Sequence, residues 1–309
     1  MKKKYNYIVI NFFRVTNPYS GASEVSYNFF KSIPSKDKKL IQFSNNNYYE
    51  KNIKNIKANT AIEKIFKIKY MSEYIVNICK KRKNPILIFE GASWIGYTFL
   101  LYNYLKNKLN NAKFIYHSHN IEYLLRKKNN NFIIAFLSKY FENFIGKKFD
   151  IFTSVSKLDQ KKLTKIYNFK SSILSNGILM PKVSRIKEKK LKYKYVFFCG
   201  SVEYQPNSEA LEILINDIMP KVNYIDPKIK LIVSGNKFLN YNSKALVNVG
   251  FVNKKKFYSY LKGASIFVNP MQTSFGSQIK MITALAFGKR NIASKNAILG
   301  LDIYKKSNI

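Results

Sequence analysis

Residues 266–289 read IFVNPMQTSFGSQIKMITALAFGK, and this stretch decides the fold class. An apolar run ends at Asn269, a loop rich in Ser and Gly follows, and apolar residues then recur three and four positions apart from Ile279 onward. A short apolar run predicts a buried strand, and the three-and-four spacing predicts a helix. The stretch therefore has the strand, loop and helix order of one unit of a parallel α/β sheet.

The same alternation runs through the chain and predicts an α/β fold with two Rossmann-like parallel-sheet domains. In the first half, strands are expected at residues 7–11, 40–43, 86–89, 113–117 and 151–155. In the second half, they are expected at 195–199, 229–234, 247–251, 266–269 and 291–294. Helices are expected at 24–32, 60–81, 94–109, 123–147, 208–219, 254–262 and 279–287.

The segment 181–194 is rich in charge and lacks apolar periodicity, which is typical of a linker. We therefore divide the chain into an N-terminal domain of residues 1–186 and a C-terminal domain of residues 187–309. Parallel α/β folds bind ligands at the carboxyl ends of their strands. The chemistry is expected in loops that follow strands, with the two sheets facing a central cleft.

The chain carries 54 Lys and Arg against 17 Asp and Glu, a net charge of +37, and only five of the basic residues are Arg. Lysine is spread over almost every helix and loop, which is typical of an AT-rich coding sequence. The alternative is a polyanionic partner. No nucleic-acid-binding motif accompanies the charge, so no specific nucleic acid is expected, and the excess favours at most peripheral contact with an anionic membrane.

Cys79 and Cys199 lie in apolar surroundings, which indicates core positions and a reducing compartment. With only two histidines beside them, no metal site is expected. The longest apolar runs, such as residues 132–137, are far shorter than the ~18 residues of a membrane-spanning helix. The short apolar start after Met1 does not resemble a signal peptide. A cytoplasmic protein is expected, with peripheral contact to the inner face of the membrane left open.

Two loops in the second half have features of anion sites. Residues 200–207, GSVEYQPN, follow a strand and precede a helix, for which Asn207 or Ser208 is the expected N-cap. An ordinary strand-to-helix turn is the alternative. Lys280 is expected in the first turn of a helix that begins near Ser277, where a cation opposes the helix dipole. A diphosphate bound between them would remove that conflict.

Together these segments resemble the GT-B glycosyltransferases, specifically the retaining group 1 (family 4) enzymes. In the second half, the residues that resemble family elements are 200–207 (the opening loop), 249–252 (the strand end that meets the nucleotide base), 268–288 (the phosphate loop and helix) and 300–301. In the first half, they are 20–23 (the loop after the first strand), 117–122 (H-N-x-E), 153–159 (V-S-x-x-D) and 175–178 (N-G-v). The elements keep the family order over nearly the whole chain.

The resemblance implies a GT-B fold and a hexosyltransferase-type glycosyltransferase. It implies transfer with retention from a nucleotide-diphosphate sugar to a glycan or lipid-linked acceptor, in cell-envelope or capsular polysaccharide synthesis, without metal or cofactor. As catalytic residues it implies His119, in contact with the transferred sugar, and Lys280, which would stabilise charge on the leaving diphosphate. The nucleotide-sugar site that it implies comprises Gly21, Gly200, Ser201, Phe251, Val252, Gly276, Ser277, Gln278, Ile279 and Thr283.

Three further ionisable residues of the first half are expected to be structural. If the strand at 113–117 continues, His117 points away from His119. Glu122 fits as a charge at a helix N-terminus. Glu142, in the middle of a predicted helix, is expected to be a solvated or ion-paired surface residue.

The chain also departs from the family pattern. The family commonly has a Glu-x7-Glu pair whose second carboxylate binds the ribose hydroxyls, and here the two positions are Phe275 and Thr283. Family members usually continue for tens of residues beyond the position of Leu301, so a truncated second domain is expected. Two hypotheses stay open: an active glycosyltransferase, or an inactive GT-B protein that serves as a scaffold or binding partner in a polysaccharide-synthesis complex.

The segment 123–148 mixes bulky apolar and basic residues. One interpretation is a surface that contacts the membrane of a lipid-linked acceptor. The other is a helix that simply packs on the sheet, as apolar residues at three-and-four spacing do in any α/β domain.

Overall fold

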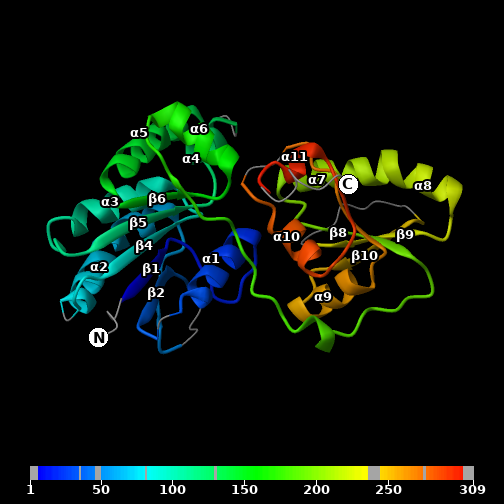
Figure 1. The fold of residues 1–309 in the computed structure, drawn as a ribbon, viewed down its shortest axis with the longest axis horizontal. Helices are drawn as coiled ribbons and strands as arrows, with labels where there is room; N and C mark the ends of the chain where they lie inside the picture. Colours follow the sequence, from blue (N-terminus) through cyan, green and yellow to red (C-terminus); the bar gives the residue numbers. More distant parts are fainter. Residues whose placement is uncertain are drawn as a thin grey trace. The chain divides into compact units, whose positions relative to one another are not determined.

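The computed structural model describes residues 6–34, 36–45, 50–80, 82–128, 131–235, 244–273 and 276–301. It divides the chain into two compact units, residues 1–177 and 178–309, each built on its own parallel sheet (Figure 1). Phe275, one of the two positions that depart from the family pair, lies outside the described residues.

The first unit is a seven-stranded sheet in the order β3-β2-β1-β4-β5-β6-β7, and all of its described pairs are parallel. Its strands are β1 (Tyr7–Asn11), β2 (Lys38–Phe43), β3 (Ile53–Ile56), β4 (Ile86–Gly91), β5 (Lys113–Ser118), β6 (Ile151–Ser154) and β7 (Ser172–Ile173). Its helices are α1 (Gly21–Ser32), α2 (Ala61–Cys79), α3 (Ile95–Leu105), α4 (Glu122–Lys128), α5 (Phe132–Lys148) and α6 (Lys157–Tyr167). All five predicted strands are confirmed.

Three elements of this unit were not predicted, and one predicted helix is two. β3 and β7 are only four and two residues long, and α6 carries too few apolar residues for its periodicity to be clear. The helix expected over 123–147 is divided into α4 and α5 because Asn131 caps α5, its Oδ1 accepting a hydrogen bond from the Ile134 amide at 3.1 Å.

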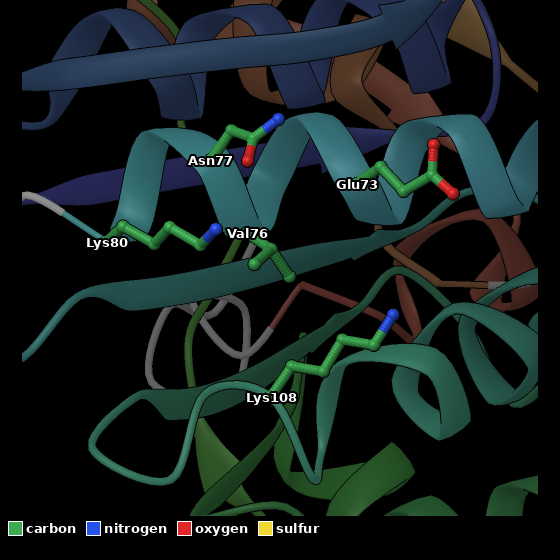
Figure 2. Close-up of a pocket in the computed structure, with 5 residues that line it drawn as sticks. All are labelled: Glu73, Val76, Asn77, Lys80 and Lys108. Atoms are coloured by element: carbon green, nitrogen blue, oxygen red, sulfur yellow. The ribbon is translucent and has the colours of Figure 1, made fainter.

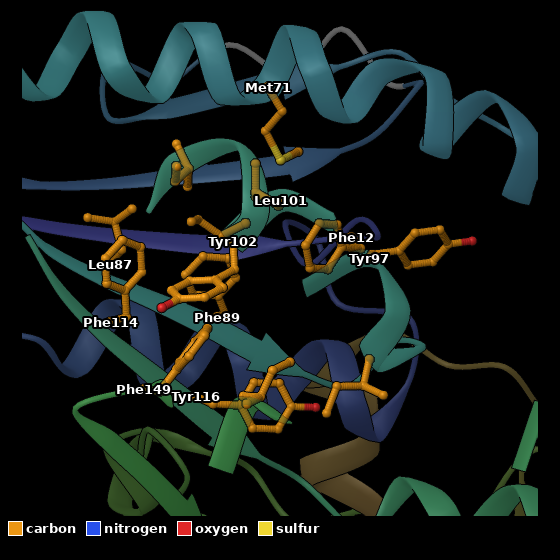
Figure 3. Packing of buried hydrophobic residues seen from close by; sticks show 14 of the residues in the cluster. Phe12, Met71, Leu87, Phe89, Tyr97, Leu101, Tyr102, Phe114, Tyr116 and Phe149 are labelled. Atoms are coloured by element: carbon orange, nitrogen blue, oxygen red, sulfur yellow. The ribbon is translucent and has the colours of Figure 1, made fainter. Parts of the chain in front are cut away.

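Both faces of the first sheet are buried, which is why its strands are apolar almost throughout. Alternate residues of a strand pack on opposite faces of the sheet. Ile8 and Ile10 belong to a core shared with α2, α3, α5 and α6, whereas Val9 packs with Phe30 of α1. Figure 3 shows the larger core, with Met71 of α2 above the sheet and Phe89, Phe114 and Phe149 packed together. The buried thiol of Cys79 belongs to this core, as predicted.

The second unit is a five-stranded parallel sheet in the order β10-β9-β8-β11-β12. Its strands are β8 (Tyr195–Cys199), β9 (Lys230–Ser234), β10 (Leu246–Gly250), β11 (Ile266–Asn269) and β12 (Asn291–Ala293), within about one residue of the predicted ranges. Its helices are α7 (Gln205–Ile213), α8 (Met219–Ile225), α9 (Lys254–Gly263), α10 (Ile279–Ala286) and α11 (Lys295–Ile298). A π-helical turn, Leu214–Ile218, joins α7 to α8.

Helix α7 begins earlier than predicted. Its N-cap is Tyr204, so the expectation of Asn207 or Ser208 as N-cap is wrong. Pro206 occupies the first turn, where its fixed φ favours the helix and its missing amide costs nothing. Asn207 therefore lies inside the first turn, and its side chain does not cap the helix but forms hydrogen bonds with Ser201 and Lys280.

The segment after Gly177 packs on the second unit, which places the boundary nine residues before the division drawn from sequence. Lys262 Nζ on α9 donates to the carbonyl oxygens of Val183 and Ile186, at 3.1 and 2.8 Å. Ser259 Oγ donates to the Lys187 carbonyl oxygen at 2.7 Å. Backbone carbonyls, which composition does not reveal, thus attach this charged segment to α9.

None of the helices in the described ranges combines the length and the apolar character that crossing a membrane requires.

Candidate functional site

The second sheet has a topological switch point between β8 and β11. The chain leaves β8 toward β9 on one side, whereas β11 lies on the other side, so the loops after β8 and β11 diverge from neighbouring strand ends. Ligands of open α/β sheets bind at such a point, beyond the carboxyl ends of the strands. The two segments that the sequence singled out, 200–207 and 270–280, follow these two strands.

Lys280 joins the two segments. It is the second residue of α10, and its Nζ donates to the Cys199 carbonyl oxygen at 3.1 Å and to Asn207 Oδ1 at 2.7 Å. The ammonium also stands 4.9 Å from the centroid of the Phe198 ring. Burial lowers the pKa of Lys280 to about 8. The lysine is therefore mostly protonated at pH 7, and both of these hydrogen bonds go to neutral oxygens.

Asn207 is the residue of this site whose role sequence reasoning missed. Its Nδ2 donates to the Ser201 carbonyl oxygen at 2.9 Å while its Oδ1 accepts from Lys280. It thereby fixes the loop after β8 against α10. The YQPN motif was the available signal, but it was interpreted as a helix cap.

Glycines allow the strand ends to approach closely. A Cβ on Gly200 would lie 2.6 Å from the Asn207 side chain, and a Cβ on Gly235, after β9, would lie 2.0 Å from the Gly200 carbonyl oxygen. The Gly235 amide in turn donates to the Gly250 carbonyl oxygen at 3.2 Å. The ends of β8, β9 and β10 are thus in direct contact, and Phe251 and Val252 follow Gly250.

The loop before α10 has its own close approach. Gly276 has φ +59°, in the left-handed region that favours glycine. A Cβ on Gly300 would lie 2.1 Å from the Gly276 carbonyl oxygen and 2.9 Å from the Ser277 amide nitrogen. Gln278 is the N-cap of α10, and its side chain makes no capping hydrogen bond to this helix start. Amide groups at such a start are suited to an anion.

The remaining predicted residues of this unit are placed as follows. Thr283 is buried one turn into α10, where its Oγ1 donates to the Ile279 carbonyl oxygen at 2.8 Å. The Phe251 side chain is 66% exposed, so its ring is accessible to solvent. Lys280, Gly200, Ser201 and Gly276–Ile279 thus surround the switch point, and Phe251 and Val252 lie at the end of β10.

In the first unit, the two predicted residues lie near the carboxyl ends of strands. Gly21 is the first residue of α1, which follows β1. His119 follows β5 and is 8% exposed. Its Nε2 lies 2.8 Å from Oε2 of Glu90, the buried carboxylate near the end of β4.

His117 lies on the same side as His119, so the expectation that it points away is wrong. Residues two apart on an extended segment share a face, and His117 Nδ1 lies 2.9 Å from Glu90 Oε1. Desolvation would raise the pKa of Glu90, but His117 and His119 outweigh it and lower that pKa to about 2. Burial, partly offset by Glu90, lowers the pKa of His119.

Glu142 is fully buried, so its assignment to a solvated or ion-paired surface is also wrong. Its carboxylate accepts the amides of Glu122 and Tyr123 at 2.7 and 3.0 Å and the hydroxyl of Tyr167 at 2.5 Å. A residue of α5 therefore caps the start of α4, a tertiary contact that helix periodicity does not reveal. Desolvation raises the pKa of Glu142 to about 7. Glu122 begins α4, as predicted, and pairs with Arg126 at 2.7 Å.

A surface hollow of about 590 Å³ lies elsewhere in the first unit. It is lined by Glu73, Val76, Asn77, Lys80 and Lys108 (Figure 2). Lys80 directly follows α2 and Lys108 precedes β5, so the hollow lies toward the amino ends of the strands. We assign it no role in the site, because ligands of this fold class bind at the opposite edge.

Residues 193–303 match the family model described as glycosyl transferases group 1. No curated protein sequence matches the chain. Among solved structures, the trehalose-6-phosphate synthase OtsA is similar, with a TM-score of 0.68 and 8% identity over 95% of this chain and 86% of that one. The α,α-trehalose-phosphate synthase (UDP-forming) of Burkholderia xenovorans, solved with glucose-6-phosphate, has a TM-score of 0.67 and 6% identity, covering 94% and 86% of the two chains.

The catalytic domain of starch synthase IV from Arabidopsis thaliana, bound to ADP and acarbose, is also similar. Its TM-score is 0.64 at 11% identity, covering 98% of this chain and 86% of that one. At these identities the structural likenesses show the fold, and the family match covers the unit that carries Lys280. The chain thus has the GT-B fold, and residues 193–303 match the group 1 glycosyltransferase family model.

Proposed function

We propose that the chain transfers a hexose from a nucleotide-diphosphate sugar to a glycan or lipid-linked acceptor, with retention and without a metal in the chemical step. The observation that carries the proposal is Lys280: a partly desolvated ammonium at the switch point, hydrogen-bonded to Cys199 and Asn207 through neutral oxygens and placed in the first turn of α10. A cation in this place opposes the helix dipole, and a diphosphate bound between them would satisfy both.

The diphosphate would lie against the loops that begin at Gly200 and Gly276. There Lys280 and the amides at the start of α10 would stabilise the negative charge that develops on the leaving group. The exposed ring of Phe251 would face the base. Thr283 would offer the ribose one neutral contact in place of a carboxylate. Two of the similar structures support this class of donor, since the starch synthase is bound to ADP and the structure described as trehalose-6-phosphate from E. coli is bound to UDP-2-fluoro glucose.

On the acceptor side we assign His119 to the transferred sugar and Gly21 to the loop around it. Glu90 would fix the His119 ring, since a carboxylate 2.8 Å from Nε2 selects the tautomer protonated there. The product would belong to cell-envelope or capsular polysaccharide, made at the cytoplasmic side of the membrane.

A lipid-linked acceptor would require contact with a membrane surface, and α5 offers one. Phe132, Ile133 and Phe136 are 69%, 76% and 72% exposed, whereas Phe141 stacks on Phe99 of α3 with ring centroids 4.4 Å apart. The helix therefore has an inner aromatic face and an outer apolar face, to which Lys147 and Lys148 add charge near its end. Flotation with vesicles of phosphatidylglycerol tests this contact, and Phe136→Asp is expected to reduce it. Binding that ignores both lipid charge and this substitution would contradict it.

The alternative is an inactive GT-B protein that acts as a scaffold. It is favoured by Thr283, whose hydroxyl is already engaged by the Ile279 carbonyl oxygen and which lacks the charge of a carboxylate. Active transfer by the wild-type chain would remove this alternative. Activity gained only on Thr283→Glu would support it.

The test is release of nucleoside diphosphate from UDP-, GDP- and TDP-sugars by the purified chain, with and without glycan acceptors. We expect turnover of at least one donor. Lys280→Ala should abolish it while the far-UV spectrum and melting temperature are maintained. Lys221→Ala, which removes an exposed lysine of α8 in the same unit, should leave it unchanged. No turnover with any donor would contradict the proposal.

A further inference from the structure

The two histidines of the chain and Glu90 form one buried cluster, in the unit that does not contain Lys280. Glu90 of β4 and His117 of β5 are register partners on neighbouring strands, and His119 follows two residues later. Each carboxylate oxygen faces one imidazole nitrogen, at 2.9 Å for His117 Nδ1 and 2.8 Å for His119 Nε2. Among the residues that the structure describes, one donor atom from each of these three side chains lies within 4.8 Å of the other two.

The charge of this cluster calls for a counter-charge. The Glu90 side chain is 0% exposed, and each of its two oxygens faces an imidazole nitrogen. A buried carboxylate is costly unless it is paired. Its two described ion-pair partners are histidines, which supply a positive charge only when protonated. A cation bound at the cluster would supply the positive charge directly.

The buried side chain of Asn11 is a second observation that favours a cation bound at this cluster. This residue ends β1 directly after Ile10, whose register partner is Phe89, so Asn11 and Glu90 stand side by side at the switch point of the first sheet. The Asn11 side chain is 0% exposed, and neither its Oδ1 nor its Nδ2 has a hydrogen-bond partner among the described residues. A buried amide oxygen without a partner carries an uncompensated desolvation cost. An ion held beside it would recover that cost.

We propose that Glu90, His117 and His119 bind one divalent transition-metal ion of the zinc type, with Asn11 Oδ1 beside the open position. Two imidazoles and one carboxylate are a donor set that zinc takes, and three protein ligands leave a fourth position. Donor atoms around a tetrahedral zinc are about 3.4 Å apart, given bonds of about 2.1 Å. The three side chains would therefore draw together and give up their direct hydrogen bonds.

This site differs from the sequence expectation, which foresaw no metal because it counted cysteines and histidines and placed His117 away from His119. It shares His119 and Glu90 with the acceptor side of the proposed glycosyl transfer: a bound ion would hold the His119 ring in place of the direct Glu90 hydrogen bond, and the chemical step itself needs no metal. The ion would tie the ends of β4 and β5 together, and it would stabilise the folded chain because the donors are assembled only there.

The test uses the full chain, purified with a histidine-free affinity tag and stripped with a chelator. Titration with ZnCl₂ is expected to show one equivalent bound and a rise in melting temperature. CoCl₂ should give the visible bands of a nitrogen and oxygen site, without the thiolate band that a cysteine ligand would produce. Because the chain has two histidines, both imidazole resonances should shift together in the NMR spectrum.

Glu90→Gln and His119→Gln should each weaken zinc binding by at least about tenfold. Glu73→Gln, which neutralises an exposed carboxylate of α2, should bind like the wild type. No binding at one equivalent, or binding that leaves both histidines and the cobalt spectrum unaffected, would overturn the proposal. If both ligand variants fail to fold, the wild-type cobalt and NMR spectra decide alone.

Discussion

Lys280 Nζ on α10 donates a 2.7 Å hydrogen bond to Asn207 Oδ1 on α7. The two residues are 73 positions apart in the chain, and their contact joins the loop after β8 to the loop after β11 at the switch point of the second sheet. The site of the second unit is thus held by one side-chain pair rather than by a single loop.

Asn207→Ala removes the acceptor that orients Lys280 and the donor to the Ser201 carbonyl oxygen. We expect affinity for UDP or for the preferred nucleotide to fall about tenfold, since a lost hydrogen bond to a charged group costs about 1.5 kcal/mol. Isothermal titration measures it. Asn223→Ala, which removes a structural hydrogen bond to the Ile229 carbonyl oxygen, should lower stability but leave affinity alone. Equal losses of affinity in both variants would count against a specific role for Asn207.

The lowered pKa of Lys280, about 8, sets a pH dependence for nucleotide binding. The protonated form attracts a diphosphate and is about half-populated at pH 8, so affinity should be nearly constant below pH 7 and about half its maximum at pH 8. Above pH 8 the affinity should fall further, several-fold by pH 9.5. Because one proton is lost, the fall cannot be steeper than tenfold per pH unit. Lys280→Ala should bind weakly with no such step. A wild-type affinity that is flat to pH 9.5 would exclude this lysine as the titrating contact.

The same pKa affects the stability of the free protein. Because the folded pKa lies below the ordinary value of 10.5, the unfolded chain binds the proton more tightly between pH 8 and 10.5, and stability should rise with pH in that window. Lys280→Met is therefore expected to be at least as stable as the wild type at pH 7. Urea unfolding at pH 7 would show a clear loss of stability if Lys280 were instead a structural residue.

A substitution at Gly300 tests whether the site needs the close contact between Gly300 and the loop that precedes α10. A Cβ there would lie 2.1 Å from the Gly276 carbonyl oxygen, so Gly300→Ala must displace the loop that precedes α10. We expect it to weaken nucleotide binding at least tenfold and to destabilise the fold by roughly 2 kcal/mol. Gly177→Ala is the control, because its Cβ would meet nothing within 4 Å. Similar behaviour of the two variants would show that the loop does not need this contact.

The raised pKa of Glu142 leads to a second pH effect on stability, opposite in sign to that of Lys280. Desolvation raises the folded pKa of Glu142 to about 7 from 4.5, so its contribution to stability is fully present below pH 4.5 and is lost as pH rises through 7. Relative to Glu142→Gln, the wild type should lose on the order of 2 kcal/mol of stability between pH 5 and pH 8. Chemical unfolding of both proteins at the two pH values measures the difference. A constant difference would mean that Glu142 does not titrate in this range.

The periodicity of the sequence predicted most of the fold. Strands buried on both faces appear in the sequence as short apolar runs, and helices with one apolar face appear as apolar residues three and four positions apart. The periodicity missed β3, β7 and α6 in the first unit and α8 and α11 in the second, which are short or polar. The start of α7 was misplaced because Asn207 resembles an N-cap, although Pro206 had already set the first turn.

Of the candidate sites, the sequence pointed to Lys280 and to both loops around it. It did not reveal Asn207, the burial of Glu142, or the meeting of Glu90 with both histidines. Each of these depends on which strands and helices become neighbours, as when β4 pairs with β5 and brings residue 90 beside residue 117. Sequence spacing carries no information about such pairs.

Calorimetric titration of UDP-, GDP- and TDP-sugars into the wild-type chain and into Lys280→Ala tests the central claim most directly. The account predicts that at least one donor binds the wild type at one site, and that Lys280→Ala loses that binding while its melting temperature does not fall. Binding of equal strength to both proteins, or no binding of any donor to the wild type, would contradict it.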